Sequence, residues 1–326
     1  MIFMEYLNDT IDFAAYLRAT DHMVLVKPAS TFVDKAKERL RHHSRMKKTY
    51  LPWFKTQDSF YFRPGEVTMV AGQNGHGKTD LTTQVALSLI GQNEKVCIAS
   101  FEMKPEITVQ RMVRMFAGTN PLSPEYHGEQ GIQVLEGLYD DFKGWATNLW
   151  LYDQTGTANA ETVLGMVRYC AKELGITFVV IDSLMKCVKG EDDYNGQKDF
   201  IDQMCAAAKD CNIHIIIVHH LKKPANEGVM PDKHDTKGSG AITDQVDNLM
   251  MVWRNKSKED ERRKQSGKKQ DEPDSYLAVR KQRNYEGSDD GEPLIALWRH
   301  RDAGQFIGNA GDSPMAFYAA YPHVVV

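Results

Sequence analysis

The chain has no unbroken apolar stretch long enough to span a membrane, although 42% of its 326 residues are hydrophobic. Residues 1–20 also lack the pattern of a secretory signal. These two absences argue against a membrane-embedded or secreted protein. We therefore expect a cytoplasmic protein that has no membrane among its partners.

Cysteine and net charge are also scarce. The five cysteines are odd in number and contain no C-x-x-C pair, and their neighbours are typical of strand and helix interiors. We therefore predict reduced core thiols and neither a disulfide framework nor a zinc site. The net charge of −4 gives no overall basic field. Any nucleic acid must therefore be bound by local basic loops.

One segment carries the strongest motif of the sequence, between an apolar run at residues 67–71 and a helix-like run at residues 81–90. Its residues are Gly72, Gln73, Asn74, Gly75, His76, Gly77, Lys78 and Thr79. They match the phosphate loop G-x-x-x-x-G-K-[ST] in its strand–loop–helix setting. Glycines let successive backbone N–H groups face an anion, and the following helix adds its positive dipole end. We predict that this loop, together with Asp80, binds a nucleoside triphosphate.

Hydrolysis needs more than a phosphate loop. Lys78 is expected to reach the β- and γ-phosphates, and the Thr79 hydroxyl to ligate Mg²⁺. Asp182 ends an apolar strand of the Walker B form and is the predicted second magnesium residue, although a strand-terminal Asp can also cap the next turn. Glu102 ends another such strand, and parallel strands deliver their last residues to one edge of a sheet. Glu102 is thus placed either to polarise water or to begin the helix at Pro105.

A third apolar strand ends at His219 and His220. A polar group at this point can hydrogen-bond the γ-phosphate and respond to its loss. Adjacent strand residues point to opposite faces, so the two histidines are not expected to share a metal ion.

Strand-like and helix-like segments alternate from Gly65 onward, which indicates a mostly parallel sheet flanked by helices. Strands are predicted at residues 67–71, 95–101, 149–153, 177–182, 214–219, 248–253, 276–282 and 294–298. Helices are predicted at residues 78–90, 105–116, 160–174 and 197–211. No long helical pattern separates the last three strands, so we expect antiparallel hairpins there.

Two segments fall outside this alternation. Residues 1–60 predict a helical extension, with a short helix after Asp9 and an amphipathic helix over residues 31–42 that packs on its own domain or on a neighbouring subunit. Residues 256–274 are densely charged and nearly free of apolar side chains, which predicts a flexible loop, either solvated or partner-binding. The expected domains are therefore residues 1–60 and an ATPase domain over residues 61–326.

The order of the motifs resembles that of a known family. The phosphate loop is followed by Ser-Phe-Glu-Met, Val-Ile-Asp-Ser, His-His-Leu-Lys-Lys-Pro, Lys-Gly-Ser-Gly-Ala-Ile and Lys-Gln-Arg-Asn. Over residues 65–302 the chain is similar to RecA-fold ring helicases of the DnaB-type replicative family, most closely to the phage and mitochondrial branch of podophage helicases and Twinkle. The resemblance implies a RecA-like P-loop NTPase core that uses ATP, or another NTP or dNTP, with Mg²⁺. It also implies a ring, a hexamer, that moves 5′→3′ on single-stranded DNA and unwinds duplex.

The resemblance assigns roles to single residues. The residues that match the family's nucleotide, magnesium, base and phosphate-sensing positions are Lys78, Thr79, Asp182, Glu102 and His220. Arg283 matches an arginine finger that enters the next subunit's site, with Lys281 two residues before it. Such a finger neutralises charge that develops on the phosphoryl group. Without the family pattern, Arg283 would be taken as a solvated charge on an edge strand. Arg254 lies where similar proteins place a nucleotide-contacting Arg.

Similar proteins track DNA phosphates with two segments that face the central channel. The matching residues here are Lys222, Lys223, Lys233, Lys237, Gly238 and Ser239. Lysines, backbone N–H groups and small residues suit close contact with a phosphate backbone without base recognition. The alternative is an ordinary exposed loop. Residues 194–199 open a second candidate channel loop, but they contain few basic residues.

Some relatives carry a primase on the same chain, but residues 1–60 are too short for one and lack its cysteine spacing. A primase, a polymerase or a loader is therefore expected as a separate partner, and a phage origin would place the protein in the host cytoplasm. Two alternatives to the helicase stay open. A RecA-like recombination or accessory ATPase would share the core without strand separation, and a non-motor nucleotide switch would ignore DNA. The basic residues after His220 favour a DNA-stimulated motor over the switch.

Overall fold

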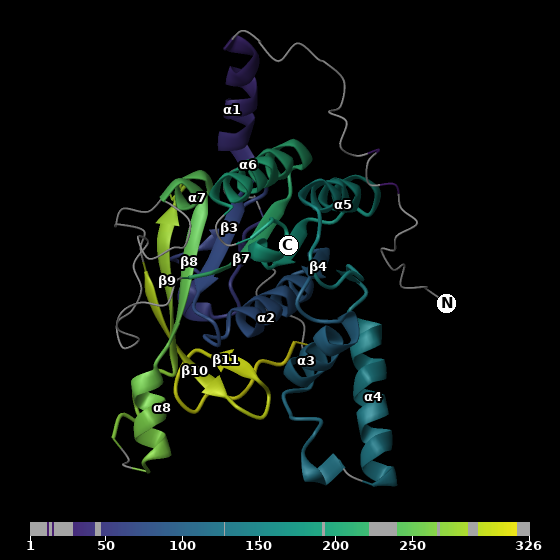
Figure 1. The fold of residues 1–326 in the computed structure, drawn as a ribbon, viewed down its shortest axis with the longest axis vertical. Coiled ribbons are helices and arrows are strands. Elements are labelled where there is room, and N and C mark those ends of the chain that lie inside the picture. The colour runs from purple at the N-terminus through teal and green to yellow at the C-terminus, as the bar shows by residue number, and fades with distance from the viewer. Residues whose placement is uncertain are drawn as a thin grey trace.

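The computed structural model describes residues 12, 15, 29–42, 47–126, 128–190, 193–221, 240–265, 268–285 and 293–317. Its centre is a nine-stranded sheet with the strand order β11-β10-β9-β8-β3-β7-β6-β4-β5 (Figure 1). The strands are β3 (Val67–Gly72), β4 (Val96–Ser100), β5 (Leu149–Leu151), β6 (Phe178–Asp182), β7 (His214–His220), β8 (Asn248–Arg254), β9 (Ser275–Gln282), β10 (Leu294–His300) and β11 (Gln305–Ile307).

The six strands from β8 to β5 are parallel, and β9, β10 and β11 each run antiparallel to the strand that precedes them in the sequence. This arrangement confirms the mostly parallel sheet and its antiparallel end. The predicted strands are all present, with ends shifted by one or two residues.

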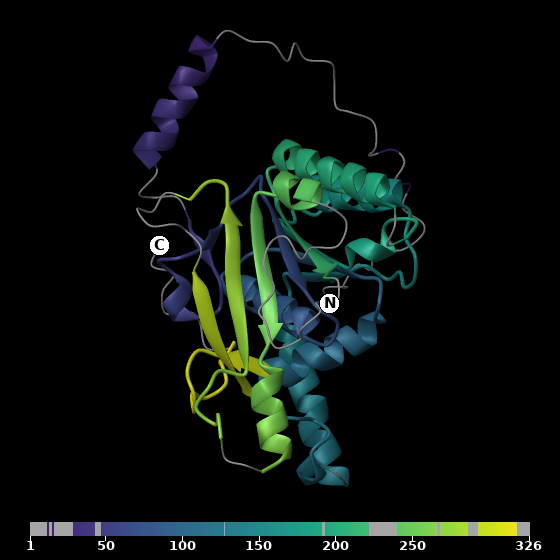
Figure 2. The same cartoon turned by 60° about the vertical axis from the view of Figure 1, so that its left-hand side comes forward.

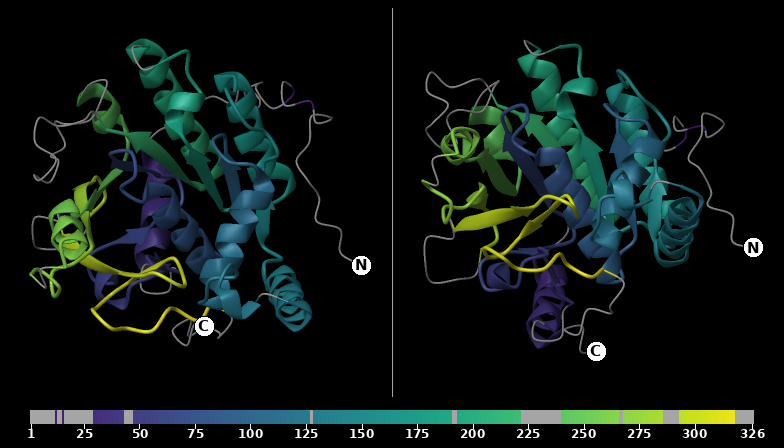
Figure 3. Two further views of the ribbon diagram at one scale, coloured as in Figure 1. Left: turned by 60° about the horizontal axis from the view of Figure 1, so that its bottom comes forward. Right: turned by 90° about the horizontal axis from the view of Figure 1, so that it is seen from below.

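The helices are α1 (Ser30–His42), α2 (Lys78–Gly91), α3 (Pro105–Ala117), α4 (Glu129–Trp145), α5 (Ala160–Glu173), α6 (Tyr194–Cys211), α7 (Gly240–Gln245) and α8 (Lys256–Arg263). Apart from α1, α4 and α8, they lie on the two faces of the sheet, and α4 packs against α3. Helices α5, α6 and α7 pack with one hydrophobic cluster, and α2, α3 and α4 pack with another. Figure 3 shows the sheet between these layers from two further directions.

Strand β6 shows why the core strands are apolar without interruption. Val179 and Ile181 belong to the cluster with α5 and α6, whereas Phe178 and Val180 belong to the cluster with α2 and α3. Successive side chains of a strand point to opposite faces, so a sheet covered on both sides needs apolar residues at every position. Full burial of one such side chain stabilises the fold by about 1.5–3 kcal/mol. All five cysteines are free and four are buried, as expected for core thiols.

The segment before the phosphate loop joins the core earlier than expected. Strands β1 (Thr49–Tyr50) and β2 (Tyr61–Phe62) form a small antiparallel sheet. Trp53, Phe60 and Phe62 from this segment are buried in the cluster with α2. The packed unit therefore begins near residue 49, before the predicted boundary at residue 61.

Helix α1 matches the amphipathic helix expected at residues 31–42. It extends away from the sheet in Figures 1 and 2. Phe32 and Val33 on this helix are about half exposed, at 49% and 48%. The short helix predicted after Asp9 lies outside the described residues, apart from residues 12 and 15.

Two helices differ from the sequence-based expectation. Helix α4 was not predicted at all, and α8 occupies the first part of the segment predicted as a flexible loop. The loop prediction is therefore wrong for Lys256–Arg263. The helix forms because Asn255 caps its N-terminus, accepting a hydrogen bond from the Lys258 backbone N–H at 3.1 Å, and because tertiary contacts bury part of a strongly polar sequence.

Candidate nucleotide site

The phosphate loop connects the end of β3 to the start of α2, as its motif predicts. Gly75 and Gly77 have φ angles of +77° and +86°, in the left-handed region that L side chains rarely adopt. Gly72 is required for a different reason, because a Cβ there would lie 2.8 Å from the Val252 carbonyl oxygen on β8. These positions let the loop curl tightly ahead of the α2 N-terminus.

Lys78 is folded back onto the loop. Its Nζ donates to the carbonyl oxygens of Gly72 and Gln73, both at 2.9 Å. Burial lowers the pKa of Lys78 to about 8, against the opposing pull of Asp182 and Glu102. A phosphate at this point would offer the ammonium group a stronger, charged acceptor than the two carbonyls.

Thr79 and Asp182 meet at the end of β6. The Thr79 hydroxyl donates to Asp182 Oδ2 at 2.8 Å. The other carboxylate oxygen, Oδ1, is buried and has no hydrogen-bond partner. Burial raises the pKa of Asp182, and the Thr79 hydrogen bond partly opposes that rise. A hydroxyl beside an unsatisfied carboxylate oxygen is the hard-oxygen donor set that suits Mg²⁺. These two residues therefore fit the metal that the motif implies.

Glu102 lies just beyond β4 and collects two hydrogen bonds. His220 Nε2 is 3.3 Å from Glu102 Oε1, and the Ser183 hydroxyl donates to the same oxygen at 3.0 Å. The hydrogen bond from His220, helped by that from Ser183, lowers the pKa of Glu102 to about 2 despite partial burial. Glu102 is therefore an anion at neutral pH. His219 is fully buried, whereas the His220 side chain is partly exposed.

A cavity of about 810 Å³ opens between these groups. The predicted residues that line it are Asn74, Gly75, His76, Gly77, Lys78, Thr79, Asp80, Glu102, His220 and Arg254. Gly72 and Gln73, the first residues of the loop, are buried, and Asp182 accepts a hydrogen bond from Thr79. The structure thus brings together predicted residues from the ends of five strands, β3, β4, β6, β7 and β8.

Several cavity residues were missed by the sequence analysis. They are Arg111, Met185, Lys186, Leu221, Glu259, Arg262, Asp274, Ser275, Arg299, Arg301 and Phe306. Arg299 among them forms an ion pair with Asp80 at 2.6 Å, and its guanidinium lies 4.6 Å from the Phe306 ring centre. Arg299 lies on β10, far from the loop in sequence, and no local motif marks it.

Arg254 reaches the loop from the end of β8. Its Nη1 donates to the Gly75 carbonyl oxygen at 3.0 Å, and its backbone N–H donates to His76 Nδ1 at 3.2 Å. The position predicted for a nucleotide-contacting Arg is therefore beside the phosphate loop.

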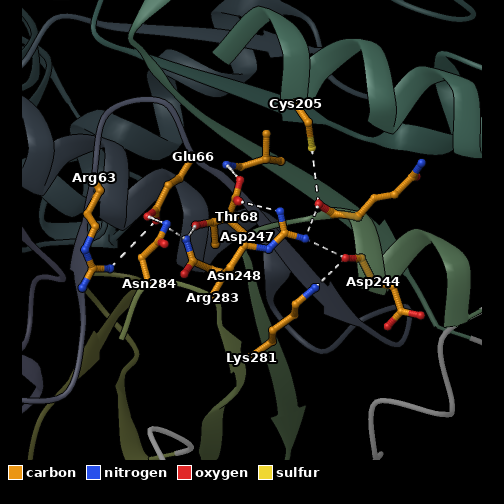
Figure 4. A network of polar contacts seen from close by, with 12 residues as sticks. Arg63, Glu66, Thr68, Cys205, Asp244, Asp247, Asn248, Lys281, Arg283 and Asn284 are labelled. Carbon is orange, nitrogen blue, oxygen red and sulfur yellow. Dashed lines mark hydrogen bonds and ion pairs between the residues drawn. The ribbon is translucent and has the colours of Figure 1, made fainter. Parts of the chain in front are cut away.

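Arg283 and Lys281 do not line this cavity. Arg283 Nη1 pairs with Asp247 at 3.3 Å, and its Nη2 donates to the carbonyl oxygens of Asp244 and Gln245 (Figure 4). Lys281 Nζ donates to the carbonyl oxygens of Thr243 and Asp244. Both cations thus sit at the carboxyl end of α7, where helix carbonyls lack partners of their own.

The predicted DNA-contacting residues lie outside the part of the chain that the structure describes. They are Lys222, Lys223, Lys233, Lys237, Gly238 and Ser239. Leu221, just before them, donates its backbone N–H to the Gly72 carbonyl oxygen at 3.0 Å. Residues 194–199, the other candidate channel segment, form the first turns of α6.

Comparison with known proteins bears on the same region. A family model described as the DnaB-like helicase C-terminal domain matches residues 55–289. The chain belongs to this family. It is accordingly a DnaB-like replicative helicase domain and an ATP-dependent DNA helicase.

Two solved structures share the fold of this DnaB-like domain. One, described as an ATPase domain, has a TM-score of 0.66 and 15% identity, over 85% of this chain and 98% of that one. The other, described as a DnaB-like replicative helicase and its interactions with primase, has a TM-score of 0.66 and 15% identity, over 86% of this chain and 67% of that one. Together with the family match, these structures confirm the predicted RecA-like fold, a mostly parallel sheet flanked by helices.

Neither a membrane-spanning helix nor a cluster of metal-ligating side chains is found among the described residues of this DnaB-like domain. None of its helices there is both long and apolar enough to cross a bilayer. No group of three or more His, Cys, Asp or Glu side chains there could hold a metal ion. The Thr79–Asp182 pair is not such a group, because nucleotide phosphates and water complete the shell of a nucleotide-bound Mg²⁺.

Proposed function

We propose that the chain is the motor of a ring helicase, a hexamer, that hydrolyses ATP with Mg²⁺ at sites shared between neighbouring subunits. One subunit supplies Lys78, Thr79, Asp182 and Glu102, and the next supplies Arg283 with Lys281. The ring moves 5′→3′ on single-stranded DNA that contacts the segments after His220, and it excludes the other strand.

The observation that carries this proposal is the position of Arg283 relative to the phosphate loop of its own chain. The Arg283 backbone N–H donates to the Asp247 carbonyl oxygen, and the Asp247 N–H donates to the Val67 carbonyl oxygen. Arg283 is thus level with the first residue of β3, whereas the loop follows the last residue, Gly72. Five residues of strand at about 3.3 Å each separate the two levels by roughly 16 Å. Arg283 thus lies near the opposite ends of the strands from the phosphate loop, where it is poorly placed to contact a nucleotide bound to the same subunit.

The residues beside the loop support hydrolysis in addition to binding. Mg²⁺, when bound, neutralises phosphate charge and orients the terminal phosphate. Lys78 exchanges its two loop carbonyls for phosphate oxygens, and Asp182 with Thr79 holds the metal. Glu102, which is ionised at neutral pH, can accept a hydrogen bond from the attacking water.

His220 links this chemistry to the segment proposed to contact DNA. It is the last residue of β7, it contacts Glu102, and it precedes Lys222 by two positions. A phosphate that attracts the His220 ring would loosen its contact with Glu102. Hydrolysis would then be coupled to a shift of the DNA-contacting segment.

The finer assignments rest on the order of the motifs. On that ground we place the chain in the phage and mitochondrial branch of the family and propose a cytoplasmic location. We also expect a separate primase, polymerase or loader as a partner. One structural relative is described together with its interactions with primase, which supports that expectation. ATP is the proposed nucleotide, with other NTPs or dNTPs as alternatives.

The decisive experiment is an unwinding assay on forked duplexes with ATP and Mg²⁺. We expect a fork with a free 5′ tail on the loading strand to be unwound, and Lys78→Ala to abolish both unwinding and hydrolysis. A recombination or accessory ATPase would hydrolyse ATP on single-stranded DNA without separating the fork. A nucleotide switch would show slow hydrolysis that DNA does not stimulate. Unwinding that survives Lys78→Ala would contradict the proposed site.

A further inference from the structure

Helix α8 forms one wall of the nucleotide cavity. Glu259 and Arg262 from α8 line the cavity, as do Asp274 and Ser275, which lead into β9. In Figure 1 this helix lies beyond the carboxyl end of β8, at the opposite end of the molecule from α7. The charged segment after β8 is therefore part of the site, although its composition suggests a solvated excursion.

Tertiary contacts hold α8 in place. Asn255 is buried and donates from Nδ2 to Glu272 Oε2 at 2.9 Å and to the Pro273 carbonyl oxygen at 3.1 Å. Lys258 is also buried, and its Nζ pairs with Asp274 Oδ1 at 3.0 Å. Two buried polar side chains thus connect the start of α8 to residues 272–274, which directly precede β9. This anchoring fixes the direction in which the next residue, Glu259, points.

Glu259 meets Arg254 at close range. Its Oε1 lies 2.6 Å from Arg254 Nε and 2.5 Å from Nη2, while the third nitrogen, Nη1, donates to the Gly75 carbonyl oxygen at 3.0 Å. The Glu259 side chain is only 13% exposed, so the carboxylate is largely withdrawn from water. All three guanidinium nitrogens are therefore engaged, two by Glu259 and one by the phosphate loop.

A carboxylate at the edge of a phosphate site repels the anionic ligand unless a nearby cation offsets its charge. Here its charge is matched by Arg254, and the pair fixes the plane of the guanidinium against Gly75. Gly75 has a positive φ and is exposed, and it has no side chain that could hold the loop backbone by packing. The restraint comes from Arg254, and through Arg254 from Glu259.

We propose that Glu259 is a positioning residue that acts through Arg254 to hold the phosphate loop in its nucleotide-binding shape. This inference rests on the proposal that the nucleotide occupies the cavity beside Lys78. It makes α8 a device for tuning nucleotide affinity, distinct from the residues that touch the reacting phosphate.

The test compares Glu259→Gln with Asp260→Asn, a matched control on the same helix whose side chain is 59% exposed and pairs only with Arg263 in the described contacts. Binding of a fluorescent ATP analogue with Mg²⁺ is titrated on the full chain. We expect about tenfold weaker binding for E259Q, the lower end of what one lost charged hydrogen bond contributes, and no change for D260N. For DNA-stimulated hydrolysis, KM should rise by a similar factor while kcat changes less.

A double-mutant cycle separates positioning from a merely structural role. Arg254→Ala should weaken binding, and the double variant R254A/E259Q should bind no more weakly than R254A, because Glu259 acts only through Arg254. Additive losses would overturn the inference, and so would E259Q binding at or above the affinity of the unaltered chain. If E259Q lowers the unfolding midpoint, all four proteins are titrated at a temperature where each is folded.

Lys78→Ala distinguishes failure of this inference from failure of the proposed site. If K78A binds the analogue as tightly as the unaltered chain, the nucleotide is not in this cavity. If K78A loses binding and E259Q does not, the site stands and only the role of Glu259 is wrong.

Discussion

Glu102 and His220 are 3.3 Å apart, between Oε1 and Nε2, although they come from strands that are not neighbours. Strand β6 lies between β4 and β7 in the sheet. Ser183, directly after β6, donates to the same Glu102 oxygen. Three successive strand ends thus converge on one carboxylate, which connects the candidate base to the residue that precedes the proposed DNA contacts.

We predict that Glu102→Gln lowers DNA-stimulated ATP hydrolysis by about 100-fold or more, because general-base assistance of this kind contributes ~10²–10⁴-fold. Nucleotide affinity should stay within about twofold, since Glu102 does not hold the phosphate loop. Phosphate release and analogue binding measure the two effects. The exposed Glu106 on α3 provides the control variant, Glu106→Gln, which should behave as the unaltered chain.

His220→Asn should also slow hydrolysis, and its effect should not add to that of Glu102→Gln. Residues that act as one unit give strongly non-additive losses of rate. The measurement is kcat for the two single variants and the double variant on single-stranded DNA. Losses that multiply would mean that the two residues act independently.

Gly72→Ala should cost both stability and nucleotide binding. The added Cβ would lie 2.8 Å from the Val252 carbonyl oxygen, so β8 or the loop must shift. Overpacking of this kind costs about 1–3 kcal/mol. Gly137→Ala is the control, since its Cβ meets nothing within 4 Å on α4, and it should stabilise by up to ~1 kcal/mol. The free energy of unfolding in urea and the affinity for the ATP analogue are measured for both variants. Equal values for the two variants would contradict the prediction.

The free energy of unfolding should fall as pH drops below neutrality because of His214. This side chain is buried between the Thr68 hydroxyl, 2.9 Å from Nε2, and the Arg63 carbonyl oxygen, 2.7 Å from Nδ1. A carbonyl only accepts, so Nδ1 carries the proton of a neutral ring. Burial lowers the pKa of His214 to about 4, from 6.5 in the unfolded chain.

The unfolded state therefore binds one more proton than the native state between about pH 6.5 and pH 4, and the native state loses stability across that window as pH falls. At 1.36 kcal/mol per pH unit the loss reaches about 2 kcal/mol at pH 5. Urea unfolding at pH 7 and pH 5 measures it. His214→Gln, less stable at pH 7, should lose less between the two pH values. An equal loss in both proteins would assign the effect to other groups.

Mixing two inactive variants tests whether sites are shared between subunits. Lys78→Ala keeps an intact Arg283, and Arg283→Ala keeps an intact phosphate loop. Mixed rings should therefore contain some complete sites, and hydrolysis should rise above that of either variant alone. A finger of this type contributes about 10³–10⁵-fold to kcat, so restored sites are readily detected. No recovery in confirmed mixed rings would contradict the shared site.

Much of the fold and the phosphate end of the site could be predicted, because both are encoded locally. The run from Val67 to Thr79 contains its own strand, its own turn glycines and its own helix start. The strand that ends at Asp182 is apolar at every position, which indicates burial on both faces. Neither inference needs knowledge of a distant residue.

Helices α4 and α8 could not be predicted for the opposite reason. Gly131, Gly137 and Gly144 weaken the local helical preference of α4, by about 1 kcal/mol each relative to alanine. Phe142 and Trp145 nevertheless pack against Phe116 on α3, with an edge-on and a tilted ring contact, which holds the helix in place. In α8 the dense charge suggested a solvated loop, but Asn255 and Lys258 find partners near the start of β9. In both helices tertiary contacts outweigh local preference.

The sequence by itself determined the parallel sheet, the phosphate loop and the carboxylates that follow two of its strands, since strand period, turn glycines and motif spacing are short-range properties. Only the tertiary structure decided that Glu102, Ser183 and His220 share hydrogen bonds, that Arg299 and Glu259 belong to the cavity, and that Arg283 lies level with the start of β3. Each of these depends on the order and register of strands that are distant in sequence, which packing of the whole sheet selects.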